Sequence, residues 1–109
     1  MYFNKVELDK ALEYQSKSLA VRVNTYGEHH PDVEMSYKKV GSVYDCRGEL
    51  DQALEDYPKS MASSFNVHGE GNPNVALLYN TIGNVYRKKG DVNKAQEYYN
   101  NSLAIYLNM

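Results

Sequence analysis

The stretch YKKVGSVYDCRG at residues 37–48 returns 42 positions later as YNTIGNVYRKKG at residues 79–90. The same shift aligns residues 7–48 with residues 49–90 and leaves 19 of the 42 positions identical. A partial third copy begins at Asp91. A period of this size is typical of a solenoid, in which each unit buries its apolar face only against its neighbours. We therefore expect recognition by an extended surface rather than chemistry in a pocket.

The composition indicates one small domain or part of a longer array. The chain has 109 residues, of which 42% are hydrophobic and 24% charged, and its net charge is −2. Because the Lys and Arg residues are dispersed, we expect no nucleic-acid partner. No apolar run approaches membrane-spanning length and no secretory leader is recognisable, so we expect no membrane association. The single cysteine, Cys46, excludes an internal disulfide and favours a cytoplasmic location.

Each full repeat predicts two helices divided by glycine, and the short turns imply antiparallel hairpins. Pro31 and Pro73 stand where a first helical turn begins, because the missing N–H of proline costs nothing there. Asn72 is a good N-cap, whereas His30 is a poorer one. Glycines that can take the left-handed conformation close the helices: Gly27, Gly48, Gly69 and Gly90. The five predicted helices span residues 8–25, 31–47, 50–66, 73–89 and 92–107.

Three residues inside these helices are unusual. Gly41 and Gly83 each cost about 1 kcal/mol relative to alanine in a helix interior. Because both copies carry the glycine, we interpret it as a place where two helices approach closely, with Ala53 and Ala95 as the small partners on the facing helix. Pro58 removes a backbone donor within the helix over residues 50–66, and we expect a kink there.

The pattern Tyr37-x-x-Val40-Gly41-x-x-Tyr44…Ala53-x-x-x-Tyr57, with its second copy Tyr79-x-x-Ile82-Gly83-x-x-Tyr86…Ala95-x-x-x-Tyr99, resembles the tetratricopeptide repeat. The 42-residue period is similar to the variety found in kinesin light chains and nephrocystin-like proteins. The resemblance covers essentially the whole chain. It departs from the family pattern at Gln15, where an aromatic residue is expected, and at Pro58.

The resemblance implies an all-α, right-handed superhelical solenoid of antiparallel helix pairs, without catalytic activity or a cofactor. Its units would be a partial one at residues 1–26, which holds the second helix only, and full ones at residues 31–67 and 73–108. Met1 and Tyr2 align with Val43 and Tyr44, so we expect the chain to begin in the tail of a first helix. The resemblance also implies a concave groove that binds a peptide or a helix of a partner protein.

In this family the first helix of each pair lines the groove, which singles out one stripe on each of two helices. On the helix over residues 31–47 the stripe is Met35, Lys38, Ser42 and Asp45, and on the helix over residues 73–89 it is Leu77, Asn80, Asn84 and Arg87. An Asn amide both donates to and accepts from a peptide backbone, and Lys38 and Arg87 could bind an acidic ligand. The alternative is that the six polar residues form an ordinary solvated face.

Other chemically interesting residues favour structural interpretations. His29, His30 and His68 do not have the spacing of a metal site, since adjacent histidines in a turn cannot both point at one ion from a helical face. Residues 87–89, Arg-Lys-Lys, are explained by the dipole of the helix that they end. Cys46 has no evident base and is interpreted as an ordinary free thiol.

Two functions follow from these observations. The first is a protein-interaction module that holds a partner's peptide or helix. The second is a structural element that self-associates, because the stretches at residues 1–6 and 105–109 leave apolar groups without a covering helix. Enzyme function is a distant third, since no nucleophile motif, phosphate loop or paired-carboxylate pattern is present.

Overall fold

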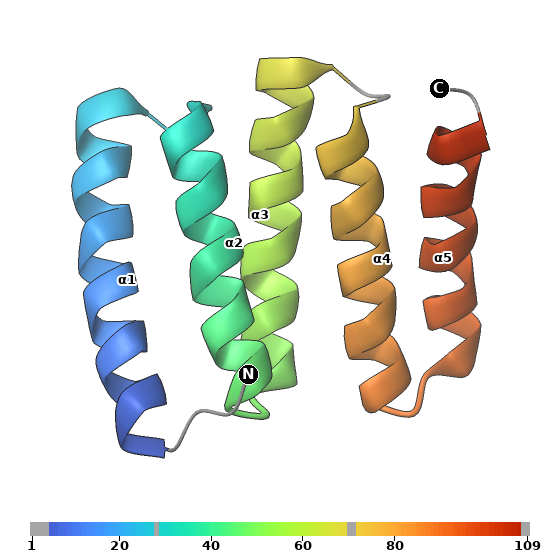
Figure 1. Cartoon of the computed structure of the whole chain (residues 1–109), viewed down its shortest axis with the longest axis horizontal. Coiled ribbons are helices and arrows are strands. Elements are labelled where there is room, and N and C mark those ends of the chain that lie inside the picture. The colour runs from blue at the N-terminus through green and yellow to red at the C-terminus, as the bar shows by residue number, and fades with distance from the viewer. Residues whose placement is uncertain (1–4, 28, 70–71, 108–109) are drawn as a thin grey trace.

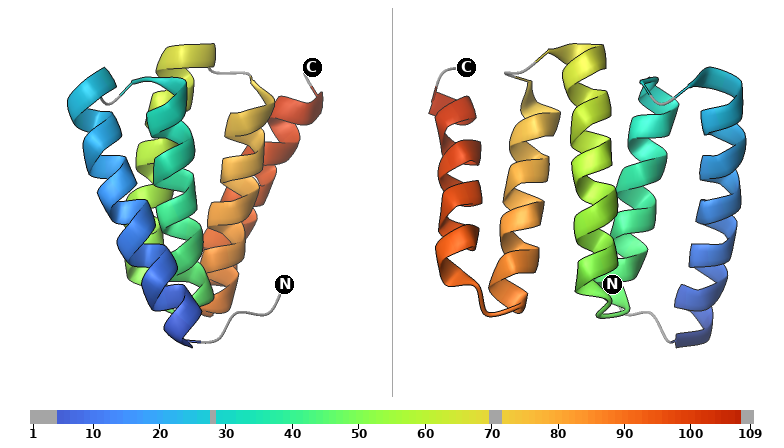
Figure 2. Two further views of the ribbon diagram at one scale, coloured as in Figure 1. Left: turned by 60° about the vertical axis from the view of Figure 1, so that its left-hand side comes forward. Right: turned by 180° about the vertical axis from the view of Figure 1, so that it is seen from behind.

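Five helices make up the described part of the chain. The computed structural model describes residues 5–27, 29–69 and 72–107. The helices are α1 (Lys5–Tyr26), α2 (Pro31–Cys46), α3 (Leu50–His68), α4 (Pro73–Lys88) and α5 (Val92–Leu107), and each predicted bound lies within three residues of the observed one. They stand side by side in chain order, each antiparallel to the next, as Figure 1 and the view from behind in Figure 2 show.

The helix ends follow from their capping residues. His30 Nδ1 accepts a hydrogen bond from Asp32 N at 3.1 Å, so the poorer of the two predicted caps does cap α2. Asn72 Oδ1 accepts from Val75 N at 3.0 Å and caps α4. Gly48 ends α2 with a φ of 79°, a value that favours glycine because it has no side chain to clash. These caps set where the chain reverses between the helices.

The close approach predicted at the two helical glycines is confirmed, but against different partners. A Cβ atom at position 41 would lie 2.9 Å from two carbons of the Tyr57 ring, and one at position 83 would lie 2.8 Å and 2.9 Å from carbons of Tyr99. The three nearest atoms to position 41 all belong to Tyr57, so the contact with Ala53 stays a prediction. The main-chain oxygen of Ala95 is a third neighbour of position 83, at 3.2 Å. Each glycine makes room for the flat face of a tyrosine on the facing helix.

A second contact repeats at the same interval. Ser60 Oγ on α3 donates to the main-chain oxygen of Glu34 on α2, and Ser102 Oγ on α5 donates to that of Ala76 on α4, both at 2.8 Å. Both serines are buried. Together with the glycine–tyrosine contact, this hydrogen bond fixes how the second helix of each pair lies on the first.

Pro58 lies within α3, which continues beyond it to His68 as a single ribbon (Figure 1). Its side chain is exposed, so the ring faces away from the neighbouring helices. The helix is continuous across this residue, and the predicted kink stays a prediction.

The best-buried cluster lies between α3 and α4. Its members are fully covered and are Ala53, Tyr57, Leu78, Ile82 and Val85, with Tyr44 of α2 among the side chains packed against them. Apolar burial of this kind supplies most of the driving force for stacking one unit on the next.

Candidate functional site

The two stripes predicted from the sequence differ in their surroundings. On α2, Met35 and Ser42 are exposed and Lys38 is half-buried. These three side chains line one groove between α1 and α2, together with residues that the sequence analysis did not select. The remaining lining residues are Leu8, Ala11 and Gln15 of α1 and Lys39, Val43 and Cys46 of α2.

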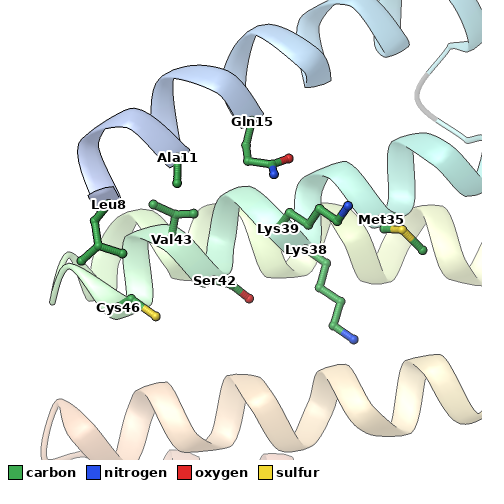
Figure 3. A pocket seen from close by; sticks show the side chains of 9 residues that line it. All are labelled: Leu8, Ala11, Gln15, Met35, Lys38, Lys39, Ser42, Val43 and Cys46. Carbon is green, nitrogen blue, oxygen red and sulfur yellow. The ribbon is translucent and has the colours of Figure 1, made fainter. Parts of the chain in front are cut away.

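This α1/α2 groove is open and mostly apolar, and it encloses about 530 Å³. Figure 3 shows Leu8, Ala11 and Gln15 pointing from α1 toward α2, while Lys38 and Ser42 extend from α2 away from α1. A groove of this volume falls in the range of ligand sites on proteins.

The α4 stripe lines no part of that groove. Leu77, Asn80 and Arg87 are exposed on α4, and Asn84 is half-buried. The side-chain oxygen of Asn84 accepts a hydrogen bond from the Tyr99 hydroxyl on α5. Asn84 therefore has a structural partner inside the chain, and its oxygen has one of its two lone pairs engaged by Tyr99.

The α3/α4 site is the equivalent of the groove one repeat further along the chain, and it is closed. Ala53, Tyr57 and Val85, the counterparts of Ala11, Gln15 and Val43, are 0%, 1% and 0% exposed. The three residues at the α1/α2 groove are all half-buried. The difference arises because α2 lies over the α3/α4 site, whereas no described helix lies over the groove.

Helix α2 holds its place over the α3/α4 site through polar contacts as well as packing. The Tyr57 hydroxyl donates to Ser42 Oγ at 3.3 Å, and Asp45 pairs with Lys88 of α4 at 2.7 Å. Burial is the main reason that the pKa of Tyr57 is raised to about 12; the hydrogen bond to Ser42 lowers this pKa, and the nearby Asp45 carboxylate raises it. The Tyr57 hydroxyl is thus neutral, and the ring that carries it is enclosed.

Basic residues at the helix ends have partners that the sequence did not reveal. Lys89, which directly follows α4, pairs with Asp51 of α3, and its counterpart Arg47, which directly follows α2, pairs with Asp9 of α1 at 3.5 Å. These ion pairs recur 42 residues apart. The basic run at residues 87–89 therefore joins neighbouring helices in addition to lying at a favourable end of the helix dipole.

The charge within the α1/α2 groove is positive. Lys38 and Lys39 line it, and neither forms an ion pair with another described residue. Cys46 is an exposed free thiol at one end of the groove. An acidic ligand would find two uncompensated ammonium groups here.

A smaller hollow of about 160 Å³ lies where α2 meets α4. Met35 and Lys38 line it from α2, and Asn74 and Leu78 line it from α4. On its rim, His68 Nε2 lies 3.4 Å from a carboxylate oxygen of Glu34. Since Met35 and Lys38 line both hollows, they connect the α1/α2 groove with the first turns of α4.

Within the ranges that the structure describes, no three His, Cys, Asp or Glu side chains gather into a possible metal site. His68 contacts a carboxylate, and His30 stacks on the Tyr26 ring with centroids 4.1 Å apart. Both histidines therefore take part in packing at the helix ends.

The α1 wall of the groove was missed because the sequence analysis considered only the first helix of each pair. The signal was nevertheless present. Gln15 aligns with Tyr57 and Tyr99, and this departure from the repeat marks the place where an enclosed tyrosine gives way to a half-buried amide.

Comparison with known proteins was made for the whole chain. Residues 1–64 and 46–108 each match the family described as Tetratricopeptide repeat. A solved structure of BtubC (BKLC) from P. vanneervenii superposes with a TM-score of 0.88 at 24% identity, covering 94% of this chain and 40% of that chain. No curated protein matched. The structural likeness confirms the predicted all-α, right-handed superhelical fold.

No helix among the described residues is both long and apolar enough to cross a bilayer.

Proposed function

The chain belongs to the tetratricopeptide repeat family, and on that premise we propose that it is a protein-interaction module that holds a peptide or helix of a partner protein. Repeats of this family are in general protein-interaction scaffolds. The binding surface combines the α2 stripe with the α4 stripe. The protein acts in this proposal as a non-catalytic scaffold or adaptor in the cytoplasm.

One observation carries the proposal, namely the open apolar groove lined by Met35, Lys38 and Ser42. Apolar surface that lies together and is rimmed by polar groups is a general mark of an interaction site. Its equivalent at the α3/α4 site is buried against α2, which supports the groove as a surface that can pack against another polypeptide.

The α4 stripe contributes exposed polar groups to the proposed binding surface. Asn80 and Arg87 are exposed, and exposed amide and guanidinium groups can donate hydrogen bonds to the backbone or side chains of a bound peptide. Asn84 can contribute its amide hydrogens, while its oxygen already accepts one hydrogen bond from Tyr99. The ammonium group of Lys38 and the guanidinium group of Arg87 favour ligands that carry carboxylates.

A displayed library of random peptides tests this function without a known partner. Peptides selected on the intact chain should lose at least about fivefold in affinity for the Lys38→Ala/Asn80→Ala variant, since each exposed charged or polar contact contributes about 1 kcal/mol. The matched control is Lys10→Ala/Asn100→Ala, which removes the same residue types from exposed positions on α1 and α5. If no peptide is enriched, or if both variants bind equally well, the proposal is wrong.

Self-association is the second candidate, and the face of α5 favours it. Leu103, Tyr106 and Leu107 are all at least half exposed on that helix. However, α5 and α1 are equivalent second helices of their units, so head-to-tail stacking would place like against like instead of continuing the alternation seen inside the chain. Light scattering across a dilution series decides the matter. A dimer that dissociates on dilution and is abolished by Leu103→Glu supports self-association, and a monomer throughout excludes it.

A further inference from the structure

We propose that Tyr99 of α5 is a positioning residue for the α4 stripe. Its hydroxyl holds the side-chain amide of Asn84 so that the NH₂ group faces a bound peptide and donates a hydrogen bond to it. This inference rests on the proposed function and specifies how one residue of that surface recognises a peptide. It concerns α4 and α5, which lie side by side in the structure (Figure 1).

Gly83 allows the Tyr99 hydroxyl to reach Asn84. A Cβ atom at position 83 would lie 2.8 Å and 2.9 Å from carbons of the Tyr99 ring, so a larger residue there would displace the ring. Because glycine has no such atom, the ring lies across α4 at this point. Its hydroxyl then donates to the side-chain oxygen of Asn84, the next residue along the helix.

The hydrogen bond from Tyr99 decides which way the Asn84 amide points. The oxygen of an amide only accepts hydrogen bonds, and its NH₂ group only donates them. Since the oxygen is turned toward Tyr99, the NH₂ group lies on the other side of the planar amide, where it donates to no described residue. Asn80 and Arg87, both exposed, share this face of α4 because they lie four residues before and three residues after Asn84.

The first unit shows why the arrangement is specific to the second. The Tyr57 hydroxyl has two acceptors nearby, Ser42 Oγ at 3.3 Å and a carboxylate oxygen of Asp45 at 3.5 Å. The counterpart of Asp45 in the second unit is Arg87, whose side chain has no acceptor. The proton of Tyr99 is therefore directed to the amide oxygen without competition from a carboxylate at this place.

The exposure of the position does not result from the ends of the chain. Ser42 and Asn84 are equivalent, and α2 and α4 are joined by the Asp45–Lys88 ion pair. Ser42 is exposed although α4 lies next to α2, and Asn84 is only half-buried although α2 lies next to α4. A neighbouring first helix thus leaves the position open to solvent. The main-chain carbonyl oxygens of a peptide are acceptors for the NH₂ group that any peptide supplies.

The order parameter of the Asn84 side chain gives a first test that needs no peptide. Measured by NMR relaxation of its NH₂ group, it should approach the rigid value of about 0.85 in the intact chain and fall below about 0.6 in Tyr99→Phe. Tyr98→Phe is the matched control, because it removes a hydroxyl from the neighbouring residue of α5, whose ring stacks on Tyr86. Equal order parameters in the intact chain and in Tyr99→Phe overturn the inference.

The second test uses the tightest-binding peptide selected from the displayed library. Tyr99→Phe should weaken its binding about threefold and Asn84→Ala about fivefold, since one variant frees the donor and the other removes it. The double variant should bind no more weakly than Asn84→Ala alone, because Tyr99 acts only through Asn84. Tyr98→Phe should change the affinity by less than about twofold. Circular dichroism verifies that every variant is folded.

The outcomes separate this inference from the proposed function. A loss of about fifteenfold in the double variant, the product of the two single losses, overturns the inference. An unchanged affinity in Tyr99→Phe or in Asn84→Ala also overturns it, whatever the order parameter. The proposed function stands in these cases if binding still depends on Lys38 and Asn80. If the library yields no peptide, the proposed function fails and the inference fails with it.

Discussion

The α1/α2 groove and the α3/α4 site are two copies of one arrangement, and they differ in whether a helix covers them. At the α3/α4 site, Tyr57 is enclosed beneath Gly41, and Val85 is fully buried. At the groove, Gln15 and Val43 are half-buried and the surface is open. The comparison teaches that the same packing surface is buried where a helix covers it and half-buried where no described helix does.

The largest expected effect comes from removing the enclosed ring. Tyr57→Ala should lower the free energy of unfolding by about 3–5 kcal/mol, the usual cost of truncating a buried aromatic residue. Gln15→Ala, at the equivalent open position, should change it by less than about 0.5 kcal/mol. Urea unfolding followed by circular dichroism measures both. Similar losses at the two positions would show that the groove is as closed as its counterpart.

High pH should lower the free energy of unfolding through the Tyr57 hydroxyl at the α3/α4 site, which has no counterpart at the groove. The folded pKa of Tyr57, raised by burial to about 12, lies above the unfolded value of about 10. The neutral hydroxyl therefore contributes stability that is fully present below pH 10 and is lost as the pH rises toward 12. A pKa difference of about two between the folded and unfolded states changes the free energy of unfolding by at most about 2–3 kcal/mol.

Tyr57→Phe has no proton to lose and provides the control for this effect. Over pH 10–12 the variant should lose less stability than the unmodified chain, although other tyrosines and lysines titrate in both. Urea midpoints measured at several pH values test the difference. Parallel pH profiles would mean that the Tyr57 hydroxyl is not enclosed.

Overpacking the two glycines should cost about 1–3 kcal/mol each, and Gly83→Leu should cost more than Gly41→Leu. The three nearest atoms to position 41 all belong to the side chain of Tyr57, which can shift more readily than main chain. Position 83 meets the Tyr99 ring and also the main-chain oxygen of Ala95, which cannot swing aside. Thermal unfolding of the two variants ranks them. The reverse order would show that the α2–α3 pair is packed more rigidly than α4–α5.

The smallest effect concerns the repeated serine. Ser60→Ala and Ser102→Ala should each cost about 1 kcal/mol, because each removes a buried hydrogen bond of 2.8 Å to a main-chain oxygen. Ser18, their counterpart on α1, is half-buried and makes no hydrogen bond through its side chain to any described residue. Ser18→Ala should therefore be close to neutral in the same unfolding assay. A cost at position 18 equal to the other two would be evidence against this assignment.

Much of the fold was predictable because the residues that begin and end the helices recur in both repeats. Proline and Asn72 place helix starts, and glycine places the ends, so five helices with short turns follow from the chain alone. The close approach at Gly41 also followed from its recurrence. The tyrosine ring did not follow, because helical periodicity predicts a face of small residues but not which side chain of the facing helix lies nearest to it. The ring of Tyr57 supplies the nearest atoms to position 41.

The candidate site was predictable in part. Met35, Lys38 and Ser42 of the α2 stripe line the groove, whereas Asp45 pairs with Lys88 of α4. The α1 wall was not anticipated, and Asn84 has a partner in Tyr99. Contacts between residues on different helices, such as this hydrogen bond and the Lys88–Asp45 pair, depend on the rotation of each helix about its axis. The sequence pattern sets that rotation only coarsely.

The central claim is that positions 43 and 85 are equivalent but differ in cover, and thiol labelling tests it most directly. In a Cys46→Ser background, Val43→Cys and Val85→Cys each introduce one slightly smaller side chain at an equivalent place. Under native conditions the thiol at position 43 should react with a small disulfide reagent at least about a hundredfold faster than the thiol at position 85, which becomes accessible only when the structure opens. Equal rates, or faster reaction at position 85, would contradict the account.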